Sequence, residues 1–172
     1  MSPIRVLIAD DQALVRGALA TLLGLESDLE VVAQVGRGDE VLDAVREHAV
    51  DVALVDIDMP GRDGLAATAE VVDSDLPCRC LIVTTFGRPG YLSRGMEAGA
   101  AGFIVKDTPP EALAEAIRKV HAGLRVIDPE LAQESVLLGP NPLTEREKEV
   151  LLAAATGADA REIATRLSLG EG

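Results

Sequence analysis

Residues 1–123 alternate between short apolar runs and longer stretches in which apolar residues recur at helical spacing. The runs predict five buried strands, and each strand is followed by a predicted helix. The strands are expected at residues 4–9, 30–35, 52–55, 79–84 and 102–106, and the helices at residues 13–25, 39–48, 64–72, 90–98 and 109–122. Strands and helices that alternate in this way form a parallel sheet covered by helices on both faces. The pattern therefore predicts an α/β domain with a five-stranded, doubly wound sheet.

Capping signals mark the start of two of these helices. Asp39 stands where its side chain can cap the second helix. Thr108 and Glu111 have the spacing of a capping box, and Pro109 between them suits the first position of a helix. We therefore expect Asp39 and Thr108 to act as N-caps.

The pattern changes beyond the fifth helix. Residues 124–142 are interrupted by proline and glycine, so we interpret them as a linker with one short helix at residues 129–137. Residues 143–172 predict two further helices, at residues 144–156 and 160–168. Two short helices bury little surface on their own, so this tail is expected to be one part of an all-α domain.

Composition narrows the class of protein. The 172 residues carry 29 acidic and 16 basic side chains, a formal net charge of −13, and only 2 % are aromatic. These values argue against base stacking on single-stranded nucleic acid and against a general affinity for phosphate backbones. Cys78 and Cys80 stand in an apolar stretch and are expected to be buried, reduced thiols. No apolar run is long enough to span a membrane and the N-terminus lacks the features of a signal peptide, so we expect a cytoplasmic protein without membrane insertion.

Polar residues stand where four predicted strands end: Asp10 and Asp11 after the first, Asp56 after the third, Thr84 on the fourth and Lys106 on the fifth. The carboxyl ends of parallel strands line the binding crevice of an open α/β sheet. Three converging carboxylates repel one another unless a cation joins them, and their hard oxygen ligands suit Mg²⁺. A lysine and a hydroxyl can hold a phosphoryl group, while one carboxylate attacks phosphorus to form an aspartyl phosphate. Each residue alone is explained as well by a turn, a cap or a surface position, but coincidence at four strand ends favours a site.

These strand-end residues, together with the loop Met59-Pro60-Gly61-Arg62-Asp63-Gly64, resemble the receiver domain of two-component response regulators. The resemblance covers residues 4–123, and the segment 141–151 resembles the opening of a LuxR-type helix-turn-helix domain. Together they are similar to the NarL/FixJ class, and residues 84–91 are similar to its DesR-like members. The resemblance implies a flavodoxin-like receiver domain at residues 1–123 with the strand order 2-1-3-4-5, followed by a partial helix-turn-helix tail.

The same resemblance implies a role for each carboxylate. Asp56 would be the phosphoacceptor, loaded from a phosphohistidine on a partner histidine kinase. Asp11 would bind Mg²⁺ directly and Asp10 would bind it through water. Asp56 and the backbone carbonyl of Asp58 would complete the protein ligands of the metal.

Three further residues would respond to phosphorylation in a protein of this family. Thr84 would turn its hydroxyl toward the phosphoryl group, and Phe103 would follow into the space that Thr84 vacates. Lys106 would pair with a phosphoryl oxygen. Many receivers carry proline after this lysine, whereas this chain has Asp107, and the sequence leaves open whether the peptide bond between them is cis.

The resemblance implies a signalling protein and not an enzyme, with transcriptional control as its output. One alternative is a phosphatase of the haloacid dehalogenase type, because Asp56-Ile57-Asp58 is a D-x-D motif and that chemistry also uses an aspartyl phosphate. In such phosphatases the motif is expected on the first strand and the acidic pair late in the chain, which is the reverse of the order here. The other alternative is a receiver that docks to proteins without phosphorylation, and the complete set of acidic, threonine and lysine residues argues against it.

Phosphorylation is expected to favour a homodimer. The helices at residues 13–24 and 109–122 carry apolar residues over wide arcs and resemble the usual dimer face of the class, while the helix at residues 90–98 is the alternative face. In a LuxR-type domain the recognition helix would begin just after Gly172. We therefore expect DNA binding in a longer protein but not by residues 1–172 alone.

Overall fold

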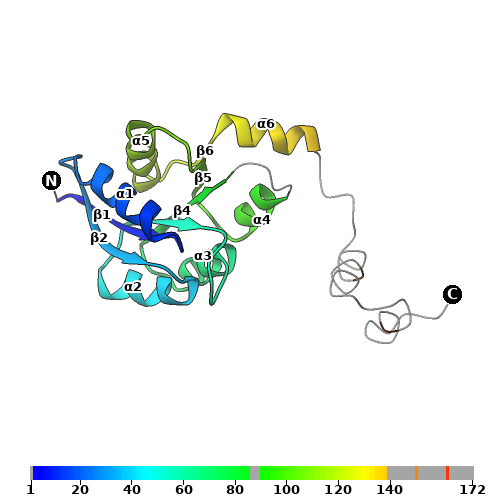
Figure 1. Ribbon diagram of the computed structural model, residues 1–172, viewed down its shortest axis with the longest axis horizontal. Coiled ribbons are helices and arrows are strands. Elements are labelled where there is room, and N and C mark those ends of the chain that lie inside the picture. Colours follow the sequence, from blue (N-terminus) through cyan, green and yellow to red (C-terminus); the bar gives the residue numbers. More distant parts are fainter. Residues whose placement is uncertain (1, 86–89, 139–149, 151–161, 163–172) are drawn as a thin grey trace. The chain divides into compact units, whose positions relative to one another are not determined.

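The computed structural model describes residues 2–85, 90–138, 150 and 162, and Figure 1 shows its arrangement. Its central feature is a parallel sheet with the strand order β2-β1-β3-β4-β5-β6. The strands are β1 (Ile4–Ala9), β2 (Leu29–Val35), β3 (Val52–Asp56), β4 (Arg79–Thr84), β5 (Gly102–Val105) and β6 (Val126–Ile127). The helices are α1 (Ala13–Leu23), η1 (Gly38–Glu40), α2 (Val41–Glu47), α3 (Gly64–Asp73), α4 (Tyr91–Glu97), α5 (Pro110–His121) and α6 (Pro129–Leu138), of which η1 is a 3₁₀ turn. The chain separates into two compact units, residues 1–137 and 138–172, and the sheet belongs to the first.

The sheet has six strands where the sequence predicts five. The predicted order 2-1-3-4-5 is confirmed, and β6 extends it at the edge beyond β5. Val126 and Ile127 of β6 pair in parallel with Gly102 and Phe103 of β5. Both residues of β6 fall in the segment 124–142 that the sequence assigns to a linker. The prediction is wrong there because a strand of two residues is too short to show any periodicity.

The short helix predicted within the linker is confirmed as α6. Asp128 stands before it, and its side chain accepts a hydrogen bond from the backbone N–H of Glu130 at 2.9 Å. The two tail helices predicted at residues 144–156 and 160–168 fall outside the described residues, except for single positions within each. The proposed boundaries of the linker and of the helix-turn-helix tail therefore stay predictions.

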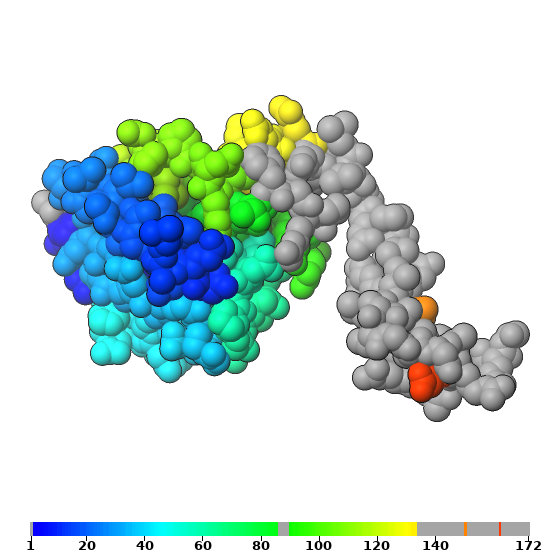
Figure 2. Space-filling view, viewed as in Figure 1, coloured from blue at the N-terminus to red at the C-terminus, as the bar shows by residue number. Residues whose placement is uncertain are grey.

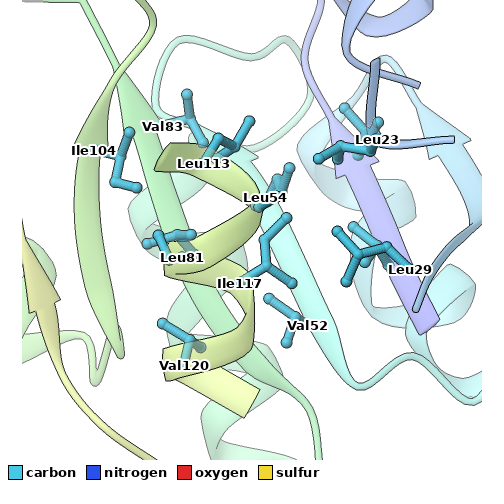
Figure 3. Close-up of a cluster of buried hydrophobic side chains, with 14 residues drawn as sticks. Leu23, Leu29, Val52, Leu54, Leu81, Val83, Ile104, Leu113, Ile117 and Val120 are labelled. Atoms are coloured by element: carbon cyan, nitrogen blue, oxygen red, sulfur yellow. The ribbon is translucent and has the colours of Figure 1, made fainter. Parts of the chain in front are cut away.

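Helices cover both faces of the sheet because its central strands alternate their buried side chains between the two faces. In β3, Val52 and Leu54 face α1 and α5, whereas Ala53 and Val55 face α2 and α3. Figure 3 shows the α5 side, where one row of helix residues packs on three strands: Leu113, Ile117 and Val120 against Val52, Leu54, Leu81, Val83 and Ile104. Burying one such side chain contributes roughly 1.5–3 kcal/mol, so the two layers fix the strand ends firmly in place.

The two predicted helix caps are wrong. α5 begins at Pro110 with Pro109 as its N-cap, and the hydroxyl of Thr108 is buried without a hydrogen-bond partner in the described part of the chain. Pro109 has an extended backbone, which is the conformation that a following proline imposes, so the helix starts one residue later than expected. Asp39 does not cap α2 but pairs with the guanidinium of Arg37 at 2.9 Å.

Two features expected from composition can be compared with the structure. Cys78 and Cys80 are free and buried, as predicted. Within the described residues, none of the helices has the length and apolar character needed to cross a membrane.

Candidate functional site

Four neighbouring strands bring the predicted polar residues to the carboxyl end of the sheet. Asp10 and Asp11 follow β1, Asp56 ends β3, Thr84 ends β4, and Lys106 follows β5. These strands are parallel and adjacent, so their carboxyl ends lie together. The chain runs outward from β1 to β2 and then returns to β3 on the other side of β1. This reversal of strand order is the position at which open α/β sheets bind their ligands.

Asp10, Asp11 and Asp56 form the acidic part of the site. One carboxylate oxygen from each lies within 4.8 Å of the corresponding oxygens of the other two. Asp10 and Asp56 are only 3 % and 5 % exposed, whereas Asp11 is open to solvent. Hard oxygen donors at this spacing, with one side open to water, fit a divalent cation that keeps part of its hydration shell.

Lys106 provides a positive charge between the two buried carboxylates. Its Nζ lies 2.8 Å from Oδ2 of Asp10 and 2.9 Å from Oδ2 of Asp56. Burial raises the pKa of Asp56, and the hydrogen bond from Lys106 counteracts this only in part. Burial also opposes the charge of Lys106, but its hydrogen bonds to Asp10 and Asp56 outweigh that effect and raise its pKa. With Asp11 included, three carboxylates face one ammonium, so negative charge is in excess.

Backbone groups hold the second oxygen of each buried carboxylate. Oδ1 of Asp10 accepts a hydrogen bond from the N–H of Gln12 at 2.8 Å, and Oδ1 of Asp56 accepts one from the N–H of Ile57 at 2.8 Å. Both side chains are thereby oriented with Oδ2 toward the lysine. Arg16 of α1 also donates to the backbone carbonyl of Asp10 at 2.6 Å, which ties the helix to the end of β1. Gln12 and Arg16 were not predicted from the sequence; the only available signal was that Gln12 directly follows the acidic pair and that Arg16 lies in the first turn of the next helix.

The loop that follows β3 packs closely against its neighbours. A Cβ atom on Gly64 would lie 1.9 Å from the carbonyl oxygen of Asp56, so α3 can begin this near to the strand only with glycine there. The N–H of Gly38 donates to the carbonyl of Pro60 at 3.1 Å and joins this loop to the one after β2. Asp58 lies within the same loop, and the role of its carbonyl as a metal ligand stays a prediction.

Thr84 and Phe103 lie in different surroundings. The hydroxyl of Thr84 donates to the carbonyl of Thr85 at 3.1 Å, at the exposed end of β4. Phe103 is 1 % exposed and belongs to a buried apolar cluster beside α4. The movements of both side chains on phosphorylation stay predictions. The described residues contain no cis peptide bond, so the bond between Lys106 and Asp107 is trans.

Comparisons with known proteins agree with this geometry. A family model described as the response regulator receiver domain matches residues 6–118. The transcriptional regulatory protein DesR of Bacillus subtilis (strain 168) is 46 % identical over 169 residues, which cover 98 % of this chain and 83 % of DesR.

Two solved structures extend the comparison. The crystal structure of the response regulator ChrA, from a heme-sensing two-component system, matches with a TM-score of 0.70 and 32 % identity, covering 99 % of this chain and 84 % of ChrA. The crystal structure of a LuxR-family two-component response regulator from Aurantimonas sp. SI85-9A1 matches with a TM-score of 0.73 and 31 % identity, covering 78 % of this chain and 96 % of that one.

Proposed function

This chain belongs to the response regulator receiver family, and from that premise we propose that Asp56 is its phosphoacceptor, loaded by a partner histidine kinase with the help of Mg²⁺. Response regulators of two-component systems are signalling proteins, and DesR is named as a transcriptional regulatory protein. Nothing in the comparisons supports the phosphatase alternative.

The observation that carries the proposal is the position of Lys106 between Asp10 and Asp56 at hydrogen-bond distance. In the reaction, a carboxylate oxygen of Asp56 would form a bond to phosphorus. The bond from phosphorus to the donor atom, a histidine nitrogen or an oxygen of acetyl phosphate, would break, and its electron pair would leave with the donor. Lys106 would then pair with a phosphoryl oxygen, because its ammonium already reaches the oxygen of Asp56. Charge neutralisation and positioning of this kind supply most of the rate in phosphoryl transfer.

Receiver domains generally bind Mg²⁺ at an acidic pocket, and the carboxylates of this chain fit that ion. We assign Asp11 and Asp56 as direct ligands, Asp10 as a ligand through water, and the carbonyl of Asp58 as the remaining protein ligand. The bound ion would neutralise charge that accumulates on the phosphoryl oxygens. Lys106 alone cannot do this, since its single charge is already shared by two carboxylates.

We further propose that phosphorylation promotes a homodimer through α1 and α5. Figure 2 shows α1 (blue) at the surface beside α5 (yellow-green). Leu14 and Leu25, on or next to α1, are 87 % and 78 % exposed, and the proposed dimer would cover them. The alternative face beside α4 is less available, because Leu131 of α6 packs into the cluster that includes Tyr91 and Leu92 of α4.

The proposed output is control of transcription, without catalytic turnover of a separate substrate. Relatives that carry the receiver domain are regulatory proteins, which is consistent with this assignment. A location in the cytoplasm, where a kinase and a promoter would both be accessible, belongs to the same proposal.

Intact-mass measurement after incubation with acetyl phosphate and Mg²⁺ tests the acceptor. We expect the mass of one phosphoryl group per chain, its loss in Asp56→Asn, and its loss when Mg²⁺ is chelated. Asp73→Asn, which changes an exposed aspartate at the end of α3, is the matched control and should be labelled normally. Labelling that persists in Asp56→Asn would exclude this residue as the acceptor.

A further inference from the structure

Among the described residues, Asp11 is the one carboxylate of the acidic site whose side chain has no hydrogen bond and no ion pair. It is also exposed to solvent. Asp10 and Asp56, by contrast, each have Oδ1 held by a backbone N–H and Oδ2 held by Lys106. The position of the Asp11 carboxylate is therefore set by its backbone, and above all by the peptide group that joins it to Asp10.

The guanidinium of Arg16 holds this peptide group. Nη1 of Arg16, in the first turn of α1, donates a hydrogen bond to the backbone carbonyl of Asp10 at 2.6 Å. That carbonyl lies in the same planar peptide unit as the N–H of Asp11, so a restraint on one fixes the other. The N–H of Asp10 in turn donates to the carbonyl of Val35 on β2 at 3.2 Å. The backbone of the acidic pair is thus held from β2 and from α1.

Gly36 leaves room for the guanidinium beside the two strand ends. It directly follows Val35, the last residue of β2, and a Cβ atom at this position would lie 3.3 Å from Nη1 and 3.7 Å from Cζ of Arg16. A larger side chain would take the place of the guanidinium, because packed interiors have little spare volume. The half-buried side chain of Arg16 therefore reaches the carbonyl of Asp10 through a space that depends on glycine.

We propose that Arg16 is a positioning residue for the metal ligand Asp11, and that it strengthens Mg²⁺ binding by holding the peptide group between Asp10 and Asp11. The proposal rests on the proposed function, because it requires Asp11 to be a ligand of Mg²⁺. Groups that orient metal ligands without touching the metal typically contribute about 10- to 100-fold to metal affinity. Asp11 should depend strongly on such a group, since its own side chain has no other restraint in the described part of the chain.

The positive charge of Arg16 separates a positioning role from a purely electrostatic one. A cation beside the acidic site repels Mg²⁺, so removal of this charge alone would strengthen Mg²⁺ binding. Loss of the hydrogen bond to the Asp10 carbonyl acts in the opposite direction, because it frees the peptide group that orients Asp11. Arg16→Met removes both the charge and the hydrogen bond. Weaker Mg²⁺ binding by this variant therefore follows from positioning and not from charge.

Titration of the unphosphorylated protein with MgCl₂, followed by its backbone amide NMR signals, measures the dissociation constant of Mg²⁺. We expect Arg16→Met to raise this constant about tenfold. Arg46→Met removes an exposed arginine of α2 and is the control with the same change of charge. It should leave the constant unchanged or slightly lower. Mg²⁺ binding by Arg16→Met that is as tight as binding by Arg46→Met, or tighter, would overturn the proposal.

Gly36→Val tests the same contact with the charge of Arg16 retained, and it decides the question if Arg16→Met does not fold. We expect valine to displace the guanidinium and to weaken Mg²⁺ binding. Gly17→Ala is the control, because a Cβ atom at Gly17 of α1 would have nothing within 4 Å. Mg²⁺ binding by Gly36→Val that equals binding by the parent would overturn the proposal.

The rate of phosphorylation by acetyl phosphate separates positioning of the metal ligand from a direct part in the reaction. Arg16→Met should be phosphorylated slowly at limiting Mg²⁺ and at the rate of the parent once Mg²⁺ saturates the site, since Arg16 acts only through Asp11. A slow rate that persists at saturating Mg²⁺ would overturn the proposal. A parent protein that binds no Mg²⁺ would overturn the metal assignment as well, so the two failures are distinguishable.

Discussion

Gly95 and Gly17 allow a matched test of how closely Phe103 packs against α4. Both glycines lie inside helices with ordinary helical backbones, in α4 and α1. A Cβ on Gly17 would have nothing within 4 Å, whereas a Cβ on Gly95 would lie 2.0 Å from Cζ of Phe103 and 3.0 Å from Cδ1 of Ile82. Substituting alanine at each position therefore makes the same change in helix propensity and differs only in packing.

The magnitudes follow from these two environments. Alanine in place of glycine in a helix interior raises the free energy of unfolding by about 1 kcal/mol, and Gly17→Ala should show the whole of this gain. Forcing a methyl group into a well-packed core costs about 1–3 kcal/mol, and Phe103 cannot yield easily because it is 1 % exposed. Gly95→Ala should therefore range from unchanged to about 2 kcal/mol less stable than the parent. The two variants should differ from each other by about 1–3 kcal/mol.

Urea unfolding of the unphosphorylated protein measures the free energy of unfolding of both variants, at a protein concentration low enough to avoid association. The substitution Phe103→Leu should remove most of the penalty, so that Gly95→Ala in that background stabilises the protein as Gly17→Ala does. Equal stabilisation by the two alanines in the parent chain would refute the packing argument. A penalty that persists with Phe103→Leu would show that another neighbour causes it.

Three other perturbations test the charges and the surface of the protein. Asp56→Asn should raise the free energy of unfolding at pH 7, because the raised pKa of Asp56 means that folding opposes its ionisation. The gain should shrink as the pH falls toward the ordinary aspartate value of 3.8, where the parent also binds the proton, and a constant gain between pH 7 and 4 would contradict this. Lys106→Met should lower the free energy of unfolding by about 3–5 kcal/mol, because it leaves the buried carboxylates of Asp10 and Asp56 without their cation. Mg²⁺ should restore part of this loss in urea unfolding. A variant as stable as the parent would refute the argument. Leu14→Glu should abolish phosphorylation-dependent dimers in light scattering without reducing phosphorylation by acetyl phosphate. The control Val72→Glu, on α3, should leave the dimers intact. Dimers that persist in Leu14→Glu would exclude the α1 face.

The strands of this fold are predictable because most of their residues are buried between the helices on the two faces of the sheet. Each of the first five appears in the sequence as a short run of mainly apolar residues, and β1 and β4 have the predicted bounds. β6 was not predictable, since its two residues are a strand only because Gly102 and Phe103 offer them an edge. The start of α5 was displaced for a local reason, the conformation that Pro110 imposes on Pro109.

The site was predictable to the extent that strand order determines it. Asp10, Asp56 and Lys106 lie at the carboxyl ends of β1, β3 and β5, which belong to one parallel sheet, so their proximity follows once the strand order is known. Gln12 and Gly95 were not predictable, because a backbone N–H at hydrogen-bond distance and the space for a ring exist only in the packed molecule. A glycine in the middle of a predicted helix is a weak signal of close packing, because the sequence does not show which side chain lies against it.

The buried charges of this receiver lie at the proposed functional site. Across the described residues, the buried polar or charged side chains are Asp10, Asp56 and Thr68, among a far larger number of buried apolar ones. Burying two carboxylates side by side opposes folding, and a single lysine compensates them incompletely. Among the described residues, buried carboxylates occur at this one point, which is expected if the excess negative charge has a use. Under the proposed function the excess would attract Mg²⁺, and with the ion bound Asp56 would accept a phosphoryl group. The unfavourable burial of these carboxylates and the proposed phosphorylation of Asp56 would then have one physical origin.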